Sequence, residues 1–100
     1  MFVIFGEYLK PLEEVERCLE AHRAFLRTQF EQGRFLVAGP QQPRTGGVII
    51  ANDGDRQELE AFLANDPFVR EGVAAFRIIE FKPTGHAPGF EAFLQDVKGA

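Results

Sequence analysis

Two ionisable residues, His22 and Asp66, occupy positions where the helical pattern of the sequence calls for apolar side chains. Leu19 and Leu26 flank His22 at helical spacing, and Asp66 follows Leu63 by three residues, so a continued helix would turn both ionisable groups inward. An imidazole paired with a carboxylate has a fixed tautomer and greater basicity, which suits a general base near neutral pH. The pattern therefore favours a His-Asp dyad for proton transfer.

Each of these residues also has a purely structural interpretation. A lone histidine on an apolar helix face is more often a core residue with satisfied hydrogen bonds than a catalytic one. Asp66 precedes Pro67, which is typical of the N-cap of a short helical turn. One aspartate can serve both roles if it uses a different oxygen for each, so both interpretations stay open from the sequence.

The other candidates for chemistry carry weaker signals. Cys18 lies one turn before His22 and is interpreted as a small buried thiol, and His86 lies in a Pro/Gly-rich segment where we expect it to be exposed. Two histidines and one cysteine without metal-ligand spacing argue against a zinc site, and no cofactor is predicted. Arg44 is a candidate for binding an anionic substrate from its loop, although a solvated arginine is the default interpretation.

Composition indicates one folded domain and excludes several classes of partner. The chain has 100 residues, 45% of them hydrophobic, and a net charge of −4. Its helical arginines, Arg23 among them, alternate with glutamates and predict a solvated helix face, so nucleic-acid binding is not expected. No apolar run approaches the length of a membrane span, the N-terminus lacks a basic start, and Cys18 is the single cysteine. We therefore expect a cytoplasmic protein that does not contact membranes.

Hydrophobic periodicity and turn residues predict four strands and two main helices that must position the dyad. Pro11 opens the first helix with Leu12 and Phe30 on its apolar stripe, Gly33 caps it, and Gly39-Pro40 stops the second strand. The strands are expected at 1–9, 35–38, 48–51 and 73–81. The helices are expected at 11–33 and from about 55, the second with an interruption at 66–68, and residues 41–47 are expected to form a loop. After a linker at 83–89, a short terminal helix is expected to carry Phe90, Phe93, Leu94 and Val97 on one face.

The order β-α-β-β-α-β predicts an α+β fold, in which two helices cover one face of a four-stranded antiparallel sheet. Right-handed crossovers place both helices on the same side, which leaves the other sheet face uncovered. The strands are apolar on both sides, so that face needs a cover. We therefore expect a homodimer that forms through the sheet face.

Five segments of the sequence form a recognisable set of motifs: AHRAFL at 21–26, QGRFLVAGP at 32–40, GGVIIA at 46–51, NDPFVREGV at 65–73 and IEF at 79–81. Together they resemble the YciI-like (YCII-related) family, within the dimeric α+β barrel superfamily. The resemblance covers most of residues 1–82, and it leaves 83–100 as a linker and C-terminal helix outside the shared domain.

The resemblance implies a ferredoxin-like domain that dimerises into an α+β barrel, with an active site on His22 and Asp66. Relatives in the superfamily include muconolactone isomerase and small enzymes that eliminate chloride from chlorinated hydroxyaromatics. The leading hypothesis is thus a cofactor-free isomerase or lyase that acts on a small cyclic or aromatic oxygenated substrate, in a pocket shaped by Gly39, Pro40 and Phe68. The alternative is a non-catalytic dimeric module that binds a small molecule or serves a structural role.

Overall fold

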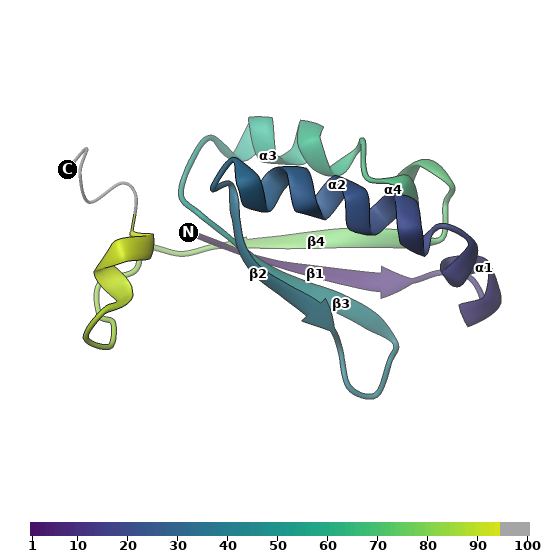
Figure 1. Cartoon of the computed structure of the whole chain (residues 1–100), viewed down its shortest axis with the longest axis horizontal. Coiled ribbons are helices and arrows are strands. Elements are labelled where there is room, and N and C mark those ends of the chain that lie inside the picture. The colour runs from purple at the N-terminus through teal and green to yellow at the C-terminus, as the bar shows by residue number, and fades with distance from the viewer. Residues whose placement is uncertain (95–100) are drawn as a thin grey trace.

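The strands form one antiparallel sheet, and the main helices cover one of its faces (Figure 1). The computed structural model describes residues 1–94. The strand order is β2-β3-β1-β4, so the N-terminal strand is central, as predicted. The α+β, ferredoxin-like fold class is confirmed. In chain order the elements are β1 (Phe2–Tyr8), α1 (Leu12–Arg17), α2 (Leu19–Glu31), β2 (Phe35–Pro40), β3 (Gly46–Ala51), α3 (Arg56–Leu63), α4 (Pro67–Arg70), β4 (Ala74–Glu80) and the 3-10 helix η1 (Phe90–Phe93).

The core lies between this sheet and helices α2 and α3. Alternate residues of β1 point toward the helices, and the register places Phe2 opposite Ala51 and Ile4 opposite Ile49 on the same face. Full burial of side chains of this size contributes about 1.5–3 kcal/mol each to stability. Leu59 of α3 is buried against this cluster, which fixes the helix over the sheet.

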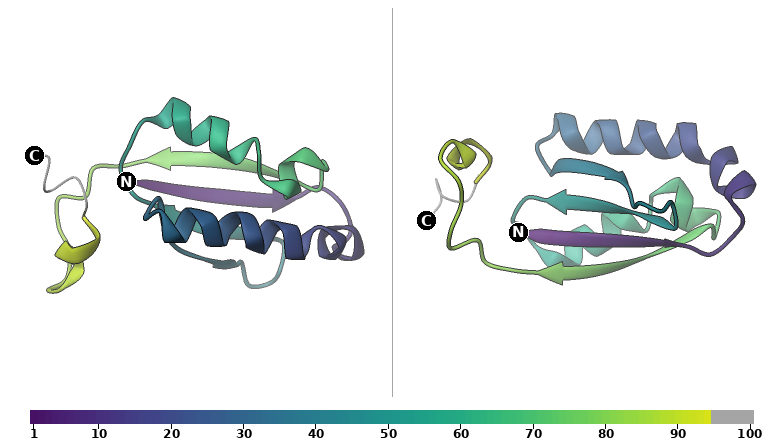
Figure 2. Two further views of the ribbon diagram at one scale, coloured as in Figure 1. Left: turned by 45° about the horizontal axis from the view of Figure 1, so that its top comes forward. Right: turned by 90° about the horizontal axis from the view of Figure 1, so that it is seen from below.

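The opposite face of the sheet is apolar and has no helix of residues 1–94 over it. In Figure 1 α2 and α3 both lie above the sheet, and Figure 2 shows the same arrangement from two further directions. Val3 pairs with Ile50 and Ile79 on this open face. Val37 and Ile79 are 58% and 42% exposed, respectively. The uncovered apolar face that the topology predicted is therefore present.

The first helix differs from the prediction because it breaks at Cys18. Helix α1 ends at Arg17, and α2 begins at Leu19. Leu12, on the separate helix α1, is 43% exposed, and Phe30, near the end of α2, is 37% exposed, although the pattern placed both on the buried stripe. Phe25 packs against the core instead.

The second and third strands extend further than predicted. Gly39 and Pro40 belong to β2, and Gly46 and Gly47 belong to β3, so the loop shortens to residues 41–45. Strand β2 is an edge strand, where proline is tolerated because its missing N–H faces no neighbour. The predicted strand stop at Gly39-Pro40 was therefore wrong.

The remaining boundaries agree with the turn chemistry of the sequence. Gly33 and Gly72 have positive φ angles of 74° and 72°, as left-handed caps require. The Asp55 side chain accepts a hydrogen bond from the Gln57 N–H and caps α3. Helix η1 lies beyond the end of the sheet, and Val97 of the expected terminal helix lies outside the described residues. The division into a domain at 1–82 and a tail at 83–100 stays a prediction.

No helix within the described range has both the length and the apolar character needed to cross a bilayer.

Candidate active site

His22 and Asp66 meet directly, although 44 positions separate them in the chain. His22 lies near the start of α2, and Asp66 immediately precedes α4. The distance from His22 Nδ1 to Asp66 Oδ1 is 2.8 Å. The Asp66 side chain is fully buried, and the His22 side chain is 13% exposed. The helical period predicted the inward direction of His22, whereas Asp66 lies beyond the end of α3 at Leu63 and contacts the imidazole from the N-cap of α4.

Asp66 also performs the structural role that the sequence suggested. It is the N-cap of α4, and its Oδ1 accepts a hydrogen bond of 2.9 Å from the Phe68 N–H. Both interactions use Oδ1, whereas the sequence suggested one oxygen for each role. A carboxylate oxygen has two lone pairs and can accept both hydrogen bonds. The other oxygen, Oδ2, is buried without a hydrogen-bond partner among residues 1–94.

The hydrogen bond to Asp66 determines which nitrogen of His22 is available for chemistry. An ionised carboxylate only accepts hydrogen bonds, so Nδ1 is the donor to such a carboxylate, and in the neutral form of the ring Nε2 then keeps its lone pair. His22 lines a cavity whose lining does not include Asp66, so the carboxylate lies behind the ring. Nε2 is then the ring nitrogen that is available to a molecule in the cavity. This is the arrangement that a general base needs.

The His22 ring is also held by an aromatic neighbour. The rings of His22 and Phe68 are stacked, with centroids 3.8 Å apart and planes inclined by 5°. Phe68 is itself buried in a cluster with Val15 and Val73, so it cannot turn freely. The stack and the hydrogen bond together fix both the plane of the imidazole and its rotation within that plane.

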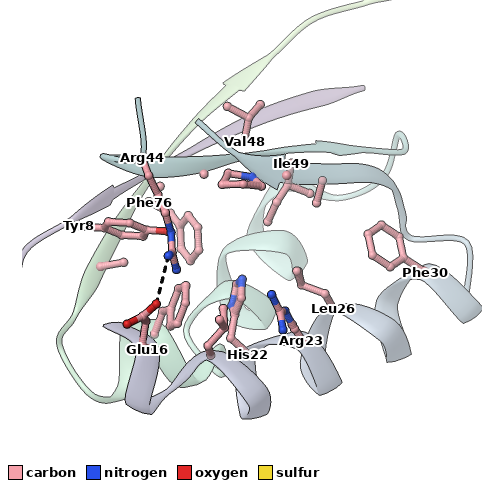
Figure 3. Close-up of a pocket in the computed structure, with 18 residues that line it drawn as sticks. Tyr8, Glu16, His22, Arg23, Leu26, Phe30, Arg44, Val48, Ile49 and Phe76 are labelled. Carbon is pink, nitrogen blue, oxygen red and sulfur yellow. Dashed lines mark hydrogen bonds and ion pairs between the residues drawn. The ribbon is translucent and has the colours of Figure 1, made fainter. Parts of the chain in front are cut away.

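The cavity lies between α2 and the sheet and has a volume of about 530 Å³ (Figure 3). Two glycines on neighbouring strands, Gly6 and Gly47, face each other in the register and form part of its wall. Because neither has a side chain, space remains between the sheet and the helix. A Cβ atom at Gly6 would lie 2.8 Å from Cε1 of Phe76, so a side chain at this position would force the Phe76 ring to move. Most of the remaining wall is apolar, with Leu19, Leu26, Ile49, Phe68 and Phe76.

Three polar side chains, those of Tyr8, Glu16 and Arg44, lie together on the loop side of the cavity. Nη1 of Arg44 lies 3.3 Å from Oε2 of Glu16, which comes from α1 (Figure 3). Neighbouring Tyr8, followed by Glu16, raises the pKa of Arg44 above its usual value, so the guanidinium stays charged. Tyr8, Glu16 and Arg44 all line the cavity.

The other predicted pocket residues also lie on the cavity wall: Gly39, Pro40, Phe68 and Arg44. Arg23 is exposed, as the sequence interpretation predicted, but it also lines the cavity next to His22, which that interpretation did not foresee. The sequence interpretation also missed Tyr8 and Glu16. Their only signal was indirect, because Tyr8 is the sole tyrosine and ends the central strand.

The weaker candidates lie outside this arrangement or support it. Cys18 is partly buried at the junction of α1 and α2, and its carbonyl accepts the His22 N–H at 2.9 Å. His86 is exposed, as expected, and lies 3.3 Å from Glu91 in the tail. Residues 1–94 contain no group of three or more His, Cys, Asp or Glu side chains arranged to hold a metal ion.

Comparisons with known proteins identify the family of the chain. The sequence profile of the YCII-related domain matches residues 1–82, so the chain belongs to the YCII-related family. No curated protein matches the sequence.

One solved structure with a similar fold is 5-chloro-2-hydroxyhydroquinone dehydrochlorinase (TftG) from Burkholderia phenoliruptrix AC1100, in complex with 2,5-dihydroxybenzoquinone. The TM-score is 0.68 and the sequence identity 23%, and the match covers 82% of this chain and 94% of the other. At this identity the similarity establishes the shared fold.

Proposed function

We propose that the protein is a cofactor-independent enzyme that transfers protons on a small cyclic or aromatic oxygenated substrate. His22 is the general base and acid, and Asp66 orients it. The observation that carries this proposal is the 2.8 Å bond from Asp66 to Nδ1, which leaves Nε2 available on the wall of a cavity.

The chemistry follows from the state of the imidazole. Nε2 removes a proton from an acidic C–H or O–H group, and the electron pair left behind moves into the ring system of the substrate. Asp66 lies against Nδ1 and balances the charge of the imidazolium that forms. An isomerase would return the proton at another atom, whereas a lyase would expel a leaving group such as chloride with the electron pair. Both belong to the isomerase and lyase chemistry that we propose.

The cavity suits a substrate of one ring. Ligand pockets typically enclose roughly 300–1,000 Å³ and combine apolar walls with a few polar groups. The volume of about 530 Å³ lies within that range, and the wall has this composition. We propose that Gly39, Pro40 and Phe68 shape the site and that Arg44 binds substrate. The dehydrochlorinase with a similar fold, which was solved with a quinone, supports a substrate of this kind.

The decisive experiment is a turnover screen with matched histidine variants. Chlorinated hydroxyhydroquinones, small lactones and cyclic acids would be incubated with the wild type, with His22→Asn and with the control His86→Asn. Loss of a general base typically lowers the rate by about 100-fold or more. We expect this loss in the His22→Asn protein and unchanged turnover in the His86→Asn protein, both of which should stay folded by circular dichroism. Equal turnover in the wild type and the His22→Asn protein would rule out the catalytic role.

A non-catalytic binding or structural module is the second candidate, and the capping role of Asp66 favours it. Oδ1 stabilises α4 whether or not a reaction takes place. A structural role for His22 predicts that His22→Asn loses folding stability before any activity is considered. A folded variant that binds ring compounds, together with a wild type that turns none over, would support the binding module.

We further propose that the protein is a homodimer that forms through the open face of the sheet. This face presents Val3, Phe5 and Ile50 between the more exposed Val37 and Ile79. Burial of an apolar face of this kind is the usual reason for a stable homodimer contact. The face also carries one acid and one base, Glu7 and Arg77, so a copy related by a two-fold axis can bring opposite charges together.

A further inference from the structure

Two arginines reach the cavity from different elements. Arg23 follows His22 on α2, and Arg44 comes from the loop between β2 and β3. Figure 3 shows Arg23 beside His22 on the helix, while Arg44 approaches from the sheet side toward Glu16. A molecule in this cavity therefore has a guanidinium available near His22 and a second one on the loop side.

The positive charge of this wall is only partly balanced. Glu16 is the one acidic residue that lines the cavity within residues 1–94, and it pairs with Arg44. Asp66 lies behind His22, and its Oδ1 already accepts two hydrogen bonds. The side chain of Arg23, which is exposed, makes no hydrogen bond and no ion pair with any other residue of that range. The positive charge of this guanidinium therefore has no partner in the described part of the chain, and a negatively charged ligand in the cavity could pair with it.

We propose that the cavity binds its substrate as an anion: a planar ring that carries an ionised oxygen, either an enolate or phenolate oxygen or a carboxylate. Arg23 contacts the oxygen near the atom that exchanges a proton with His22, and Arg44 contacts a second oxygen across the ring. The position of the reacting atom rests on the function proposed above, whereas the preference for an anion rests on the arginines alone.

The chemistry of arginine explains why these two positions suit such a ligand. The guanidinium is planar, always charged, and able to donate two parallel hydrogen bonds to a carboxylate or to neighbouring ring oxygens. Arg23 is exposed and Arg44 is 34% exposed, so the apolar wall strengthens the attraction only where a bound ring displaces water from the guanidinium groups. When Nε2 removes a proton, the negative charge left on the substrate develops next to Arg23, which stabilises it without reorganisation.

The test compares binding of ionised and neutral rings of the same shape. The ligand pairs are 2,5-dihydroxybenzoquinone with 2,5-dimethoxybenzoquinone, and benzoate with benzamide; the first member of each is ionised at neutral pH. Binding to the wild type, Arg23→Gln, Arg44→Gln and His22→Asn proteins would be measured by calorimetry and by NMR chemical shifts. Arg27→Gln is the matched control, because Arg27 is exposed on the same helix and does not line the cavity.

We expect the wild type to prefer the ionised ring of at least one pair. Hydrogen bonds to charged groups contribute about 1.5–3 kcal/mol, so each arginine variant should weaken binding of that ring by roughly 10- to 100-fold. The neutral partner and the Arg27→Gln protein should change little. The proposal would be overturned if the wild type bound neither ionised ring at millimolar concentration. It would also be overturned if the arginine substitutions weakened binding of the ionised and neutral rings equally.

The His22→Asn protein separates this inference from the proposed function. If it binds the ionised ring as the wild type does, anion recognition stands even where no turnover is found. Conversely, turnover that needs His22 but is unaffected in the Arg23→Gln and Arg44→Gln proteins would overturn the anion proposal and leave the proton-transfer function in place.

Discussion

The imidazole of His22 stacks on the ring of Phe68 at 3.8 Å, and the backbone N–H of the same phenylalanine donates to the carboxylate that holds the imidazole. Three residues from two distant segments thus support one another. Asp66 fixes one nitrogen of His22, Phe68 fixes the plane of its ring, and the cap of α4 fixes Asp66 relative to Phe68. The stacking is therefore part of how the site is positioned.

Replacement of Phe68 should affect the orientation of His22 more than a typical core substitution would. We expect Phe68→Leu to cost about 1–3 kcal/mol of stability, because Phe68 is only 4% exposed and leucine leaves part of its space empty. The His22 ring resonances should broaden or shift in NMR spectra, and the turnover rate should fall. Phe93→Leu is the control at a ring that is 50% exposed. Unchanged His22 resonances in the Phe68→Leu protein would contradict a positioning role for the stack.

Two substitutions at Asp66 should separate its capping role from its charge. Asparagine is as good an N-cap as aspartate, so Asp66→Asn should keep α4 and remain folded while it loses the negative charge against Nδ1. Asp66→Ala removes both the cap and the partner of His22 and should destabilise the fold by a further ~1–3 kcal/mol. Urea denaturation of the two variants measures the difference.

Turnover provides the second measurement for the same pair of variants. If the charge of Asp66 supports proton transfer, the Asp66→Asn protein should be folded and much slower than the wild type. Full activity in the Asp66→Asn protein would show that orientation alone suffices, and equal stability of the two variants would contradict the capping role.

The inward position of His22 and the capping position of Asp66 could be predicted from sequence because each follows from a local pattern. A helix with Leu19 and Leu26 on its inner side must also turn His22 inward, whatever the rest of the fold does. Asp66 before Pro67 carries a cap signal of the same local kind. The family resemblance added the expectation that the two residues meet.

The cavity and the arginine side chains that line it could not be predicted in this way, because they depend on contacts between distant elements. Gly6 and Gly47 create space only because β1 and β3 align them, and each alone resembles an ordinary strand or turn glycine. Arg23 has the same local pattern as a solvated helix residue, and only the position of α2 over the sheet brings it to the cavity. The helix break at Cys18 could not be predicted either, because no proline or glycine marks it in the sequence.

The turn at Gly89 should respond to acid only below the ordinary carboxyl range, because the pKa of Glu91 is lowered. Hydrogen bonds from the backbone N–H groups of Glu91 and Gly89, together with nearby His86, lower the pKa of Glu91 below its usual value. A lowered pKa in the folded state means that Glu91 stabilises the turn above the ordinary carboxyl pKa and loses this effect as the pH falls. We expect the Gly89 amide resonance to shift as Glu91 is protonated, below the pH at which an ordinary carboxyl group titrates. An acid titration of the Glu91→Gln protein should lack that shift.

The open face of the sheet predicts how the protein assembles. Val37→Glu and Ile79→Glu each place a charge on this face, and we expect them to convert a dimer into a monomer because a buried unpaired charge is costly. Leu12→Glu is the control, since Leu12 is similarly exposed but lies on α1, outside the sheet. Sedimentation velocity gives the masses. A wild type that is monomeric throughout, or a Leu12→Glu protein that dissociates equally, would contradict assembly through the sheet.

Filling the cavity from the sheet side tests whether ring compounds bind where the geometry places them. A Cβ atom at Gly47 would have the Gly39 carbonyl oxygen, 3.4 Å away, as its nearest neighbour, so the backbone at this position accepts a Cβ atom after only a small adjustment. Valine also suits a strand, and the Gly47→Val protein should remain folded. It should nevertheless lose binding of ring compounds, because the new methyl groups occupy the space opposite His22 on the cavity wall.

The control for this substitution is Gly54→Ala, because an added Cβ atom there would meet nothing within 4 Å and Gly54 lies away from the cavity. Calorimetric titration with 2,5-dihydroxybenzoquinone compares the two variants with the wild type. If the folded Gly47→Val protein bound the ring as tightly as the Gly54→Ala protein does, the ligand would have to occupy another site. Nε2 of His22 would then have no substrate within reach, and the proton-transfer proposal would fail with the binding site.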